Sequence, residues 1–184
     1  MAQGQIRIIG GQWRGRKLKV PEVPHLRPTP DRVRETLFNW LAPKIHGAHC
    51  LDPFAGSGAL GFEALSRGAA CVVMTDSSPI VIKLLQEQAA LLQTANAEIY
   101  RAAAPQQLKA PEKPFDIVFL DPPFQADLLL PTCFYLAENG FLAPRAFIYL
   151  EAAESIHEAD LPSGWTLLKS KCAGEVAYHL ARSL

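Results

Sequence analysis

The sequence predicts an α/β fold in which a doubly wound, mostly parallel sheet of seven strands ends in a β-hairpin. Three observations predict it. From residue 46 onward, short apolar runs typical of buried strands alternate with segments of helical periodicity. The first of these strands leads into a glycine-rich turn at 56–61, with the pattern G-x-G-x-x-G. The last two strands are joined by a tight turn at Ala173-Gly174, which indicates a closing antiparallel pair.

Residues 1–45 predict two short strands followed by a helix. The run at 5–9 is typical of a strand, and a glycine-rich turn within 10–18 leads into a second one. Prolines interrupt the chain up to Pro28, and we expect Thr29 to cap a helix that begins at Pro30. The apolar positions of this helix recur at helical spacing and stop before Pro43; they are Val33, Leu37, Trp40 and Leu41.

The remaining elements follow as repeated strand–helix units. The expected strands are 49–54, 71–76, 97–101, 115–121 and 146–151, then the hairpin strands 165–171 and 175–181. The expected helices are 58–66, a long helix that starts at Ser78-Pro79, and one near 126–137. The long helix should turn these apolar residues inward: Ile80, Val81, Leu84, Leu85, Leu91 and Leu92.

Length and composition favour a single domain outside the membrane. The chain has 184 residues, enough for one sizeable core, and no linker to a second domain is visible. No apolar run reaches membrane-spanning length, and the N-terminus has no apolar signal region, so we expect a cytoplasmic protein. The four cysteines are scattered without metal-ligand spacing, which predicts reduced, buried thiols and no metal site.

A net charge of zero hides a strong asymmetry along the chain. Residues 1–45 carry a net charge of +6, whereas residues 46–184 carry −6. A basic extension on an acidic body predicts an anionic polymer as partner, although a solvated surface would have a similar composition. The candidate nucleic-acid contacts are Arg14, Arg16, Lys17, Arg27, Arg32 and Arg34. We therefore divide the domain into a basic extension that is the candidate nucleic-acid surface (1–45) and an α/β core (46–184).

The glycine-rich turn is compatible with two kinds of cofactor. Its pattern, with Asp76 twenty positions after Gly56, is also that of a dinucleotide site. Asp52, however, ends the preceding strand, where a carboxylate would repel a pyrophosphate. It suits the ammonium and sulfonium of S-adenosylmethionine, and the closing hairpin is typical of methyltransferases that use this cofactor. Gly56 and Gly58 would let the backbone approach the ligand, and Asp76 would accept the ribose hydroxyls, unless it only caps the helix near Ser78.

The fourth strand ends in Asp121-Pro122-Pro123-Phe124, which matches [D/N]-P-P-[F/Y/W], the motif of enzymes that methylate planar exocyclic amines. The lone pair of such an amine is delocalised into its ring. The Asp121 carboxylate and the Pro122 carbonyl can each accept an N–H and localise that lone pair. Pro122 and Pro123 stiffen the loop, and Phe124 offers a face for stacking a base. Ligands of open α/β sheets bind beyond the carboxyl ends of the strands, so we expect this motif beside the glycine-rich turn.

Over nearly its whole length the chain resembles the bacterial 16S ribosomal RNA guanine-966 N2-methyltransferase family. The matching stretches are QIRIIGGQWRGRKL, LRPTPDRVRETLFNWLAP, LDPFAGSGALGFEALSRGA, VFLDPPF and GEVAYHLA. The resemblance implies a Rossmann-like class I methyltransferase fold and methyl transfer to the N2 amine of one guanine in the small ribosomal subunit. S-adenosylhomocysteine would be the product, and we expect the enzyme to act as a monomer.

The resemblance also assigns site residues by position. The cofactor would contact Asp52, Phe54, Ala55, Gly56, Gly58, Asp76, Ser77, Ala103 and Ala104. Ala103 departs from the family, which usually places Asp or Asn there to reach the adenine amino group, so backbone groups of Ala103 and Ala104 would have to serve. Two alternatives remain open: a methyltransferase for an amine of another RNA or DNA base, and an RNA-binding assembly factor with weak catalysis.

Overall fold

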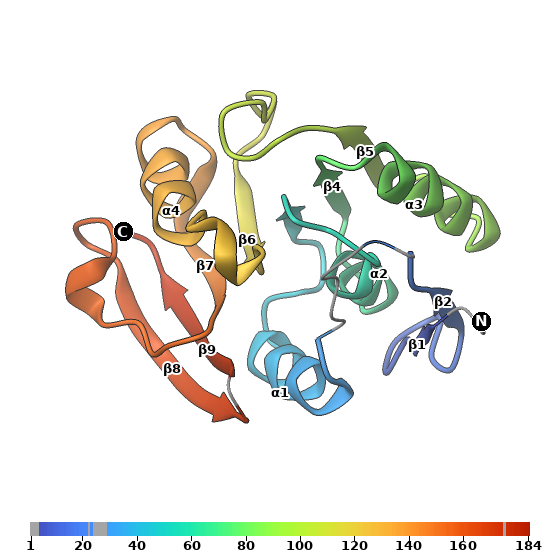
Figure 1. The fold of residues 1–184 in the computed structure, drawn as a ribbon, viewed down its shortest axis with the longest axis horizontal. Helices are drawn as coiled ribbons and strands as arrows, with labels where there is room; N and C mark the ends of the chain where they lie inside the picture. The colour runs from blue at the N-terminus through green and yellow to red at the C-terminus, as the bar shows by residue number, and fades with distance from the viewer. Residues whose placement is uncertain (1–3, 22, 24–28, 175) are drawn as a thin grey trace.

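A seven-stranded sheet forms the centre of the protein, for which we use a computed structural model (Figure 1). The structure describes residues 4–21, 23, 29–174 and 176–184. The strands of the sheet are β3 (His49–Asp52), β4 (Cys71–Asp76), β5 (Ala97–Arg101), β6 (Phe115–Leu120), β7 (Leu142–Ala152), β8 (Thr166–Ala173) and β9 (Val176–Arg182). Their order is β5-β4-β3-β6-β7-β9-β8, parallel up to β7 and antiparallel in the last two pairings. The predicted fold class is confirmed.

The two faces of the sheet bury different helices. The helices are α1 (Asp31–Leu41), α2 (Ala59–Ser66), α3 (Pro79–Leu91) and α4 (Leu129–Glu138), with short 3-10 turns η1 (Phe124–Ala126) and η2 (Glu158–Asp160). Because consecutive strand residues point to opposite faces, Cys50 packs with α1, α2 and α3, whereas Leu51 packs with α4. Each face therefore has its own apolar core, and Figure 1 shows the helices distributed around the sheet.

A small hairpin precedes this fold and packs against α2 and α3. Its strands are β1 (Gln5–Arg7) and β2 (Lys17–Lys19), paired antiparallel as predicted (Figure 1). Ile6 and Leu18 are buried in the core cluster shared with α1, α2 and α3. Buried side chains of those helices also hold its backbone, since Glu63 accepts the Gly10 N–H and Gln88 accepts the Lys19 N–H. The hairpin is thus a fixed part of the fold.

The predicted cap of α1 is wrong. Pro30 is the N-cap, with an extended backbone, and no side chain caps the helix. The Thr29 hydroxyl donates instead to Asp121 Oδ2 at 3.1 Å. Within α1, Phe38 is buried in a position that we had not assigned inward, while Trp40 is only partly buried and stacks on Tyr178.

Two inward assignments in α3 are also wrong. Ile80 and Leu91 are 62% and 67% exposed. They lie eleven positions apart, close to three turns, and therefore share the outward face of the helix. The long helix does begin as predicted, because the Ser78 side chain accepts the Val81 N–H. The helix predicted near 126–137 is α4, which begins at Leu129, and the short turn η1 precedes it.

The cysteines are unpaired but differ in burial. Cys50 and Cys133 are buried as predicted, Cys71 is partly buried, and Cys172 is exposed, so the prediction of buried thiols fails for Cys172. None of the helices in the described part of the chain has the length and apolar character needed to cross a lipid bilayer.

Candidate active site

Four carboxylates lie on one face of the sheet at the carboxyl ends of four neighbouring strands. They are Asp52 at the end of β3, Asp76 at the end of β4, Asp121 directly after β6, and Glu151 in β7. Asp52, Asp121 and Glu151 share the face of Cys50, Phe119 and Tyr149 by strand alternation. The pairing of Leu120 with Leu150 puts Asp121 level with Glu151. The strand order changes direction between β3 and β6, which is where open α/β sheets bind ligands.

The glycine-rich loop connects β3 to α2 beside these acids. Gly56 and Gly58 both have positive φ angles, of 50° and 77°, which an L side chain rarely adopts. A Cβ atom on Gly58 would lie 2.6 Å from the Phe62 ring and 2.7 Å from Leu85, so at this position the close approach is to the protein core. Gly61 lets α2 approach β4, because its Cβ would lie 2.4 Å from Met74 Sδ. The loop therefore requires glycine both for its positive φ angles and for its close packing against neighbouring side chains.

Asp52 is a buried acid whose pKa lies near neutral pH. Its side chain is almost completely covered, and Oδ2 accepts the Gly61 N–H at 3.2 Å. Burial, together with the smaller effect of the nearby Asp76 charge, raises its pKa to about 7 despite the lowering effect of the Gly61 hydrogen bond. A cation bound next to Asp52 would stabilise the ionised form of this carboxyl.

Asp76 has two local hydrogen bonds. Oδ2 accepts the Gly56 N–H at 3.2 Å and Oδ1 accepts the Ser78 N–H at 2.9 Å, so the side chain does support the entry to α3. The group is partly buried, and burial raises its pKa despite these hydrogen bonds. Each carboxylate oxygen keeps a further lone pair, so the local bonds leave room for ribose hydroxyls.

The other expected cofactor contacts surround this loop. Phe54 is partly buried, Ala55 and Ala104 are buried, and Ser77 and Ala103 are exposed. The Ser77 carbonyl already accepts from Arg101 Nε, and the Ala103 N–H already donates to Gln107 Oε1 at 3.0 Å. The Ala103 N–H can thus donate to an adenine only if its hydrogen bond to Gln107 Oε1 is broken. Sequence reasoning did not single out Gln107.

Asp121 is held between two other side chains. Thr29 donates to its Oδ2, and Glu151 lies beside it on β7. Burial raises the pKa of Asp121 well above its ordinary value, and the Glu151 charge raises it further, while the Thr29 hydrogen bond lowers it. Glu151 accepts the Tyr149 hydroxyl at 2.7 Å, and burial raises its own pKa. Neither Glu151 nor Thr29 was predicted as part of the site, because no local motif marks them.

The rest of the motif is partly open to solvent. Pro122 is buried, whereas Pro123 is exposed. Phe124 begins η1 with 44% of its surface exposed. It is accessible for stacking.

The predicted RNA contacts divide into three groups. Arg14, Arg16, Lys17 and Arg32 are exposed, as a phosphate contact requires. Arg16 also donates to the Leu91 carbonyl at 3.0 Å. Arg27 lies outside the described residues.

Arg34 is not a surface residue, and its assignment as an RNA contact is corrected. Its side chain has no exposed area; it pairs with Asp31 at 2.6 Å and donates to the Arg7 carbonyl. It also lies 3.7 Å from Glu63, which accepts from Arg67 Nε at 2.7 Å. Arg34 therefore connects α1 to the hairpin and to α2. The charge-based prediction missed this because it counted Arg34 as a free surface charge and did not consider its acidic partners, Asp31 one turn earlier in α1 and Glu63 in α2.

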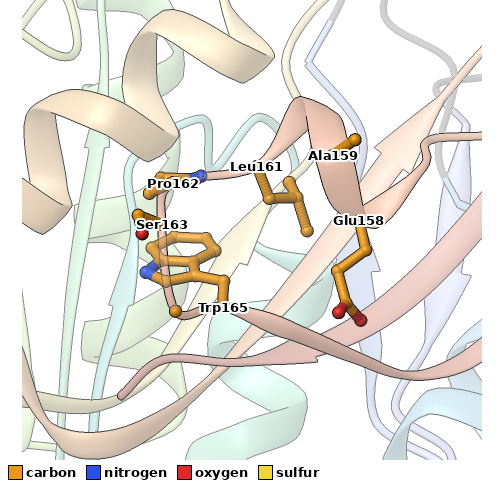
Figure 2. Close-up of a pocket in the computed structure, with 7 residues that line it drawn as sticks. Glu158, Ala159, Leu161, Pro162, Ser163 and Trp165 are labelled. Carbon is orange, nitrogen blue, oxygen red and sulfur yellow. The ribbon is translucent and has the colours of Figure 1, made fainter.

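A separate pocket lies away from these residues. Its volume is about 430 Å³, and it is lined by residues 158–165 except 160, around η2 and the start of β8 (Figure 2). Glu158 is its charged lining residue, and one carboxylate oxygen already accepts the Leu167 N–H. None of the predicted site residues lines this pocket. In the described part of the chain, no group of three or more His, Cys, Asp or Glu side chains is arranged to hold a metal ion.

Comparison with known proteins decides the family. The model of the family described as "Conserved hypothetical protein 95" matches residues 6–182. Ribosomal RNA small subunit methyltransferase D of Escherichia coli K12 is 52% identical over 177 residues, covering 96% of this chain and 89% of that protein. The protein of the same name from Haemophilus influenzae is 48% identical over 97% of this chain and 94% of its own length. The chain belongs to this family, the one that includes the proteins named ribosomal RNA small subunit methyltransferase D.

Solved structures agree with the methyltransferase D family assignment. A putative methyltransferase, yhhF, from Escherichia coli is 51% identical and superposes with a TM-score of 0.87, covering 98% of both chains. A Thermus thermophilus 16S rRNA N2 G1207 methyltransferase, solved with AdoMet and guanosine, superposes with a TM-score of 0.70 at 19% identity. It covers 100% of this chain and 50% of its own, and at that identity it shows the shared fold.

Proposed function

We propose that this protein methylates the exocyclic N2 amine of a guanine in the 16S rRNA of the small ribosomal subunit, with S-adenosylmethionine as methyl donor. Relatives up to 52% identical are named ribosomal RNA small subunit methyltransferase D, which supports the reaction class and the substrate. The observation that carries the proposal is Asp121-Pro122-Pro123-Phe124 at the same sheet edge as Asp52 and the glycine-rich loop.

The residues at this edge fit the proposed cofactor. When bound, S-adenosylmethionine supplies an electrophilic methyl group on a sulfonium. Asp52 provides a buried carboxylate for a positively charged group, and Asp76 retains lone pairs for ribose hydroxyls. A cluster of acids suits a cationic ligand better than the pyrophosphate of a dinucleotide, so the family and the electrostatics favour the same cofactor.

In this proposal, the residues of the chain act by positioning the target amine. The Asp121 carboxylate and the Pro122 carbonyl accept the two N–H groups of the amine, which localises its lone pair and aims it at the methyl group. Phe124 stacks on the base after the base leaves its helix. Asp121 accepts an N–H most strongly when it is ionised, and it begins from a raised pKa. Proton release from the amine can follow methyl transfer, so no group needs to be a strong base.

The deciding experiment is transfer of tritiated methyl to small subunits isolated from a strain that lacks the modification. We expect label in 16S rRNA and N2-methylguanosine after digestion to nucleosides. Label in another nucleoside would support the alternative of a different base. Subunit binding without label would support an assembly factor.

Replacing Asp121 tests the assignment within the site. Asp121→Ala should lower turnover at least roughly a hundredfold, the usual loss for a positioned polar group in a transition state. The affinity for S-adenosylhomocysteine, measured by calorimetry, should stay within a few fold. The matched control is Asp127→Asn, because Asp127 is exposed at the end of η1 and has no assigned role. Equal turnover in Asp121→Ala and wild type would remove Asp121 from the mechanism.

A further inference from the structure

We propose that Thr29 is a positioning residue for methyl transfer: its hydroxyl holds Oδ2 of Asp121 so that Oδ1 is presented to the target amine. This inference rests on the proposed function of Asp121. It gives the N-terminal extension, whose exposed arginines and lysines suggest RNA binding, a second task inside the active site.

The contact is long-range and partly buried. Thr29 is 5% exposed, and its Oγ1 lies 3.1 Å from Asp121 Oδ2 although the two residues are 92 positions apart. The hydroxyl does not serve α1, because the helix has no side-chain cap and Pro30 separates Thr29 from its first turn. A threonine at this position thus uses its hydrogen on a carboxylate rather than on a helix end.

The surroundings of Asp121 explain why one donor matters. The titratable groups that face it are Glu151 and Tyr149 on β7 and Asp52 on β3. Glu151 and Asp52 are acids, and the Tyr149 hydroxyl is already donated to Glu151. Among the described residues, Thr29 is the side chain that donates to Asp121. Removing that donor leaves neighbours that favour the protonated acid, which is a weaker acceptor of the amine N–H than the carboxylate.

The two oxygens of Asp121 therefore have different environments. Oδ2 is occupied by Thr29, and no hydrogen bond from the described residues reaches Oδ1. A carboxylate with one anchored oxygen has a fixed plane, so its second oxygen has a defined direction. A merely structural strap would stabilise the fold but would not alter the protonation of Asp121.

The test compares three variants of the full chain. Thr29→Val removes the hydroxyl at nearly constant volume, and Thr29→Ser retains it. Thr36→Val is the matched control, since the Thr36 hydroxyl donates to the Arg32 carbonyl on α1 and does not contact Asp121. We expect Thr29→Val to lower kcat roughly threefold to tenfold at pH 7, the scale of one lost hydrogen bond. KM for subunits and affinity for S-adenosylhomocysteine should change less than twofold.

The pH profile separates positioning from packing. Because Thr29 favours the ionised form of Asp121, the acid limb of kcat should move to higher pH in Thr29→Val, and Thr29→Ser should restore it. A lower kcat with an unmoved profile and no rescue by serine would overturn the proposal, as would wild-type behaviour of Thr29→Val.

A measurement without substrate keeps the two proposals distinct. The 13C carboxyl signal of Asp121, assigned with Asp121→Asn, should titrate at higher pH in Thr29→Val than in wild type. If that shift occurs while wild-type enzyme yields no N2-methylguanosine, the proposed function fails and the control of Asp121 by Thr29 stands. An unchanged titration would refute the role of Thr29 whatever the enzyme methylates.

Discussion

At the scale of single residues, the charge of Asp52 is set by its burial. The carboxyl is 2% exposed and has a pKa of about 7, far above its usual value of 3.8. Because the folded pKa exceeds the unfolded one, Asp52 favours folding when protonated, and this contribution is lost as the pH rises through about 7. A bound cation would reverse this preference by stabilising the carboxylate.

Cofactor affinity should therefore depend on pH around neutrality. If the ammonium group of S-adenosylhomocysteine requires ionised Asp52, binding should be about tenfold weaker at pH 6 than at pH 8, following the ionised fraction of a group with pKa near 7. Calorimetry at both pH values measures the ratio. Asp52→Asn should bind weakly and lose most of the dependence, with a smaller remainder from Asp76, whose pKa is also raised. Equal wild-type affinity at both pH values would contradict a direct or water-mediated charge interaction.

Individual residues also show where prediction from sequence ends. Asp52, Asp76 and Asp121 were found because each ends a predicted strand, and parallel strands end at one edge. Thr29 was misassigned because its partner is distant, since it contacts a residue 92 positions away. Arg34 was misassigned because its side chain is buried between a local acid, Asp31, and a distant one, Glu63 in another helix. Local pattern contains no information about the two long-range contacts. A hydroxyl before a helix resembles a cap, and an arginine in a basic segment resembles a surface charge.

At the scale of elements, the glycine-rich turn packs closely against α2 and α3 through Gly58. Gly58 has a φ of 77°, and its Cβ would contact Phe62 and Leu85 at less than 3 Å. Filling Gly58 should therefore disturb the core directly, and a loss of cofactor binding would follow from that disturbance. The sequence places glycine in this turn but could not reveal that Gly58 faces Phe62 and Leu85.

Gly47 offers a matched control for this prediction. It has a φ of 75° and no atom within 4 Å of its Cβ position, so Gly47→Ala introduces backbone strain alone. Gly58→Ala adds a collision to the same strain and should lower the free energy of unfolding by about 1–3 kcal/mol more than Gly47→Ala. Denaturant unfolding of both variants measures the difference. An equal decrease in the free energy of unfolding for both variants would show that the side chains around Phe62 move aside without loss of stability.

The faces of α3 illustrate a second limit at this scale. Its apolar residues surround much of the helix, so periodicity alone did not separate Ile80 and Leu91 from the buried Val81, Leu84 and Leu85. The buried polar Gln88 is a better marker of the inward face, but polar residues were excluded from that pattern. Gln88 is inside because both ends of its amide are bonded, to Lys19 N–H and to the Ser57 carbonyl.

At the scale of the whole molecule, the same two helices hold the basic hairpin and the glycine-rich loop. Gln88 bonds both the β2 backbone and the Ser57 carbonyl, while Glu63 in α2 accepts the Ile9 and Gly10 N–H groups. The charge asymmetry of the sequence thus becomes a spatial one, with exposed basic side chains on the hairpin and carboxylates at the sheet edge. An RNA held by the hairpin would be held at a fixed position relative to that edge.

The basic turn of the hairpin provides the last test. Arg14, Arg16 and Lys17 are exposed, and the loss of the Arg16 contact to the Leu91 carbonyl should cost little stability at the surface. If these residues contact phosphates, replacing all three with alanine should weaken small-subunit binding and reduce its salt dependence by roughly one log unit per lost contact.

A control triple variant removes the same charge elsewhere. Lys113, Lys169 and Lys171 are exposed, and the last two lie on β8, at the opposite edge of the sheet from β5. Their replacement by alanine should leave the salt slope closer to that of wild type, and both triple variants should bind S-adenosylhomocysteine normally. Filter binding over a range of salt concentrations measures the slopes. Equal slopes for the two variants would assign the effect to net charge, and a wild-type slope for the hairpin variant would mean that the RNA is bound by another surface.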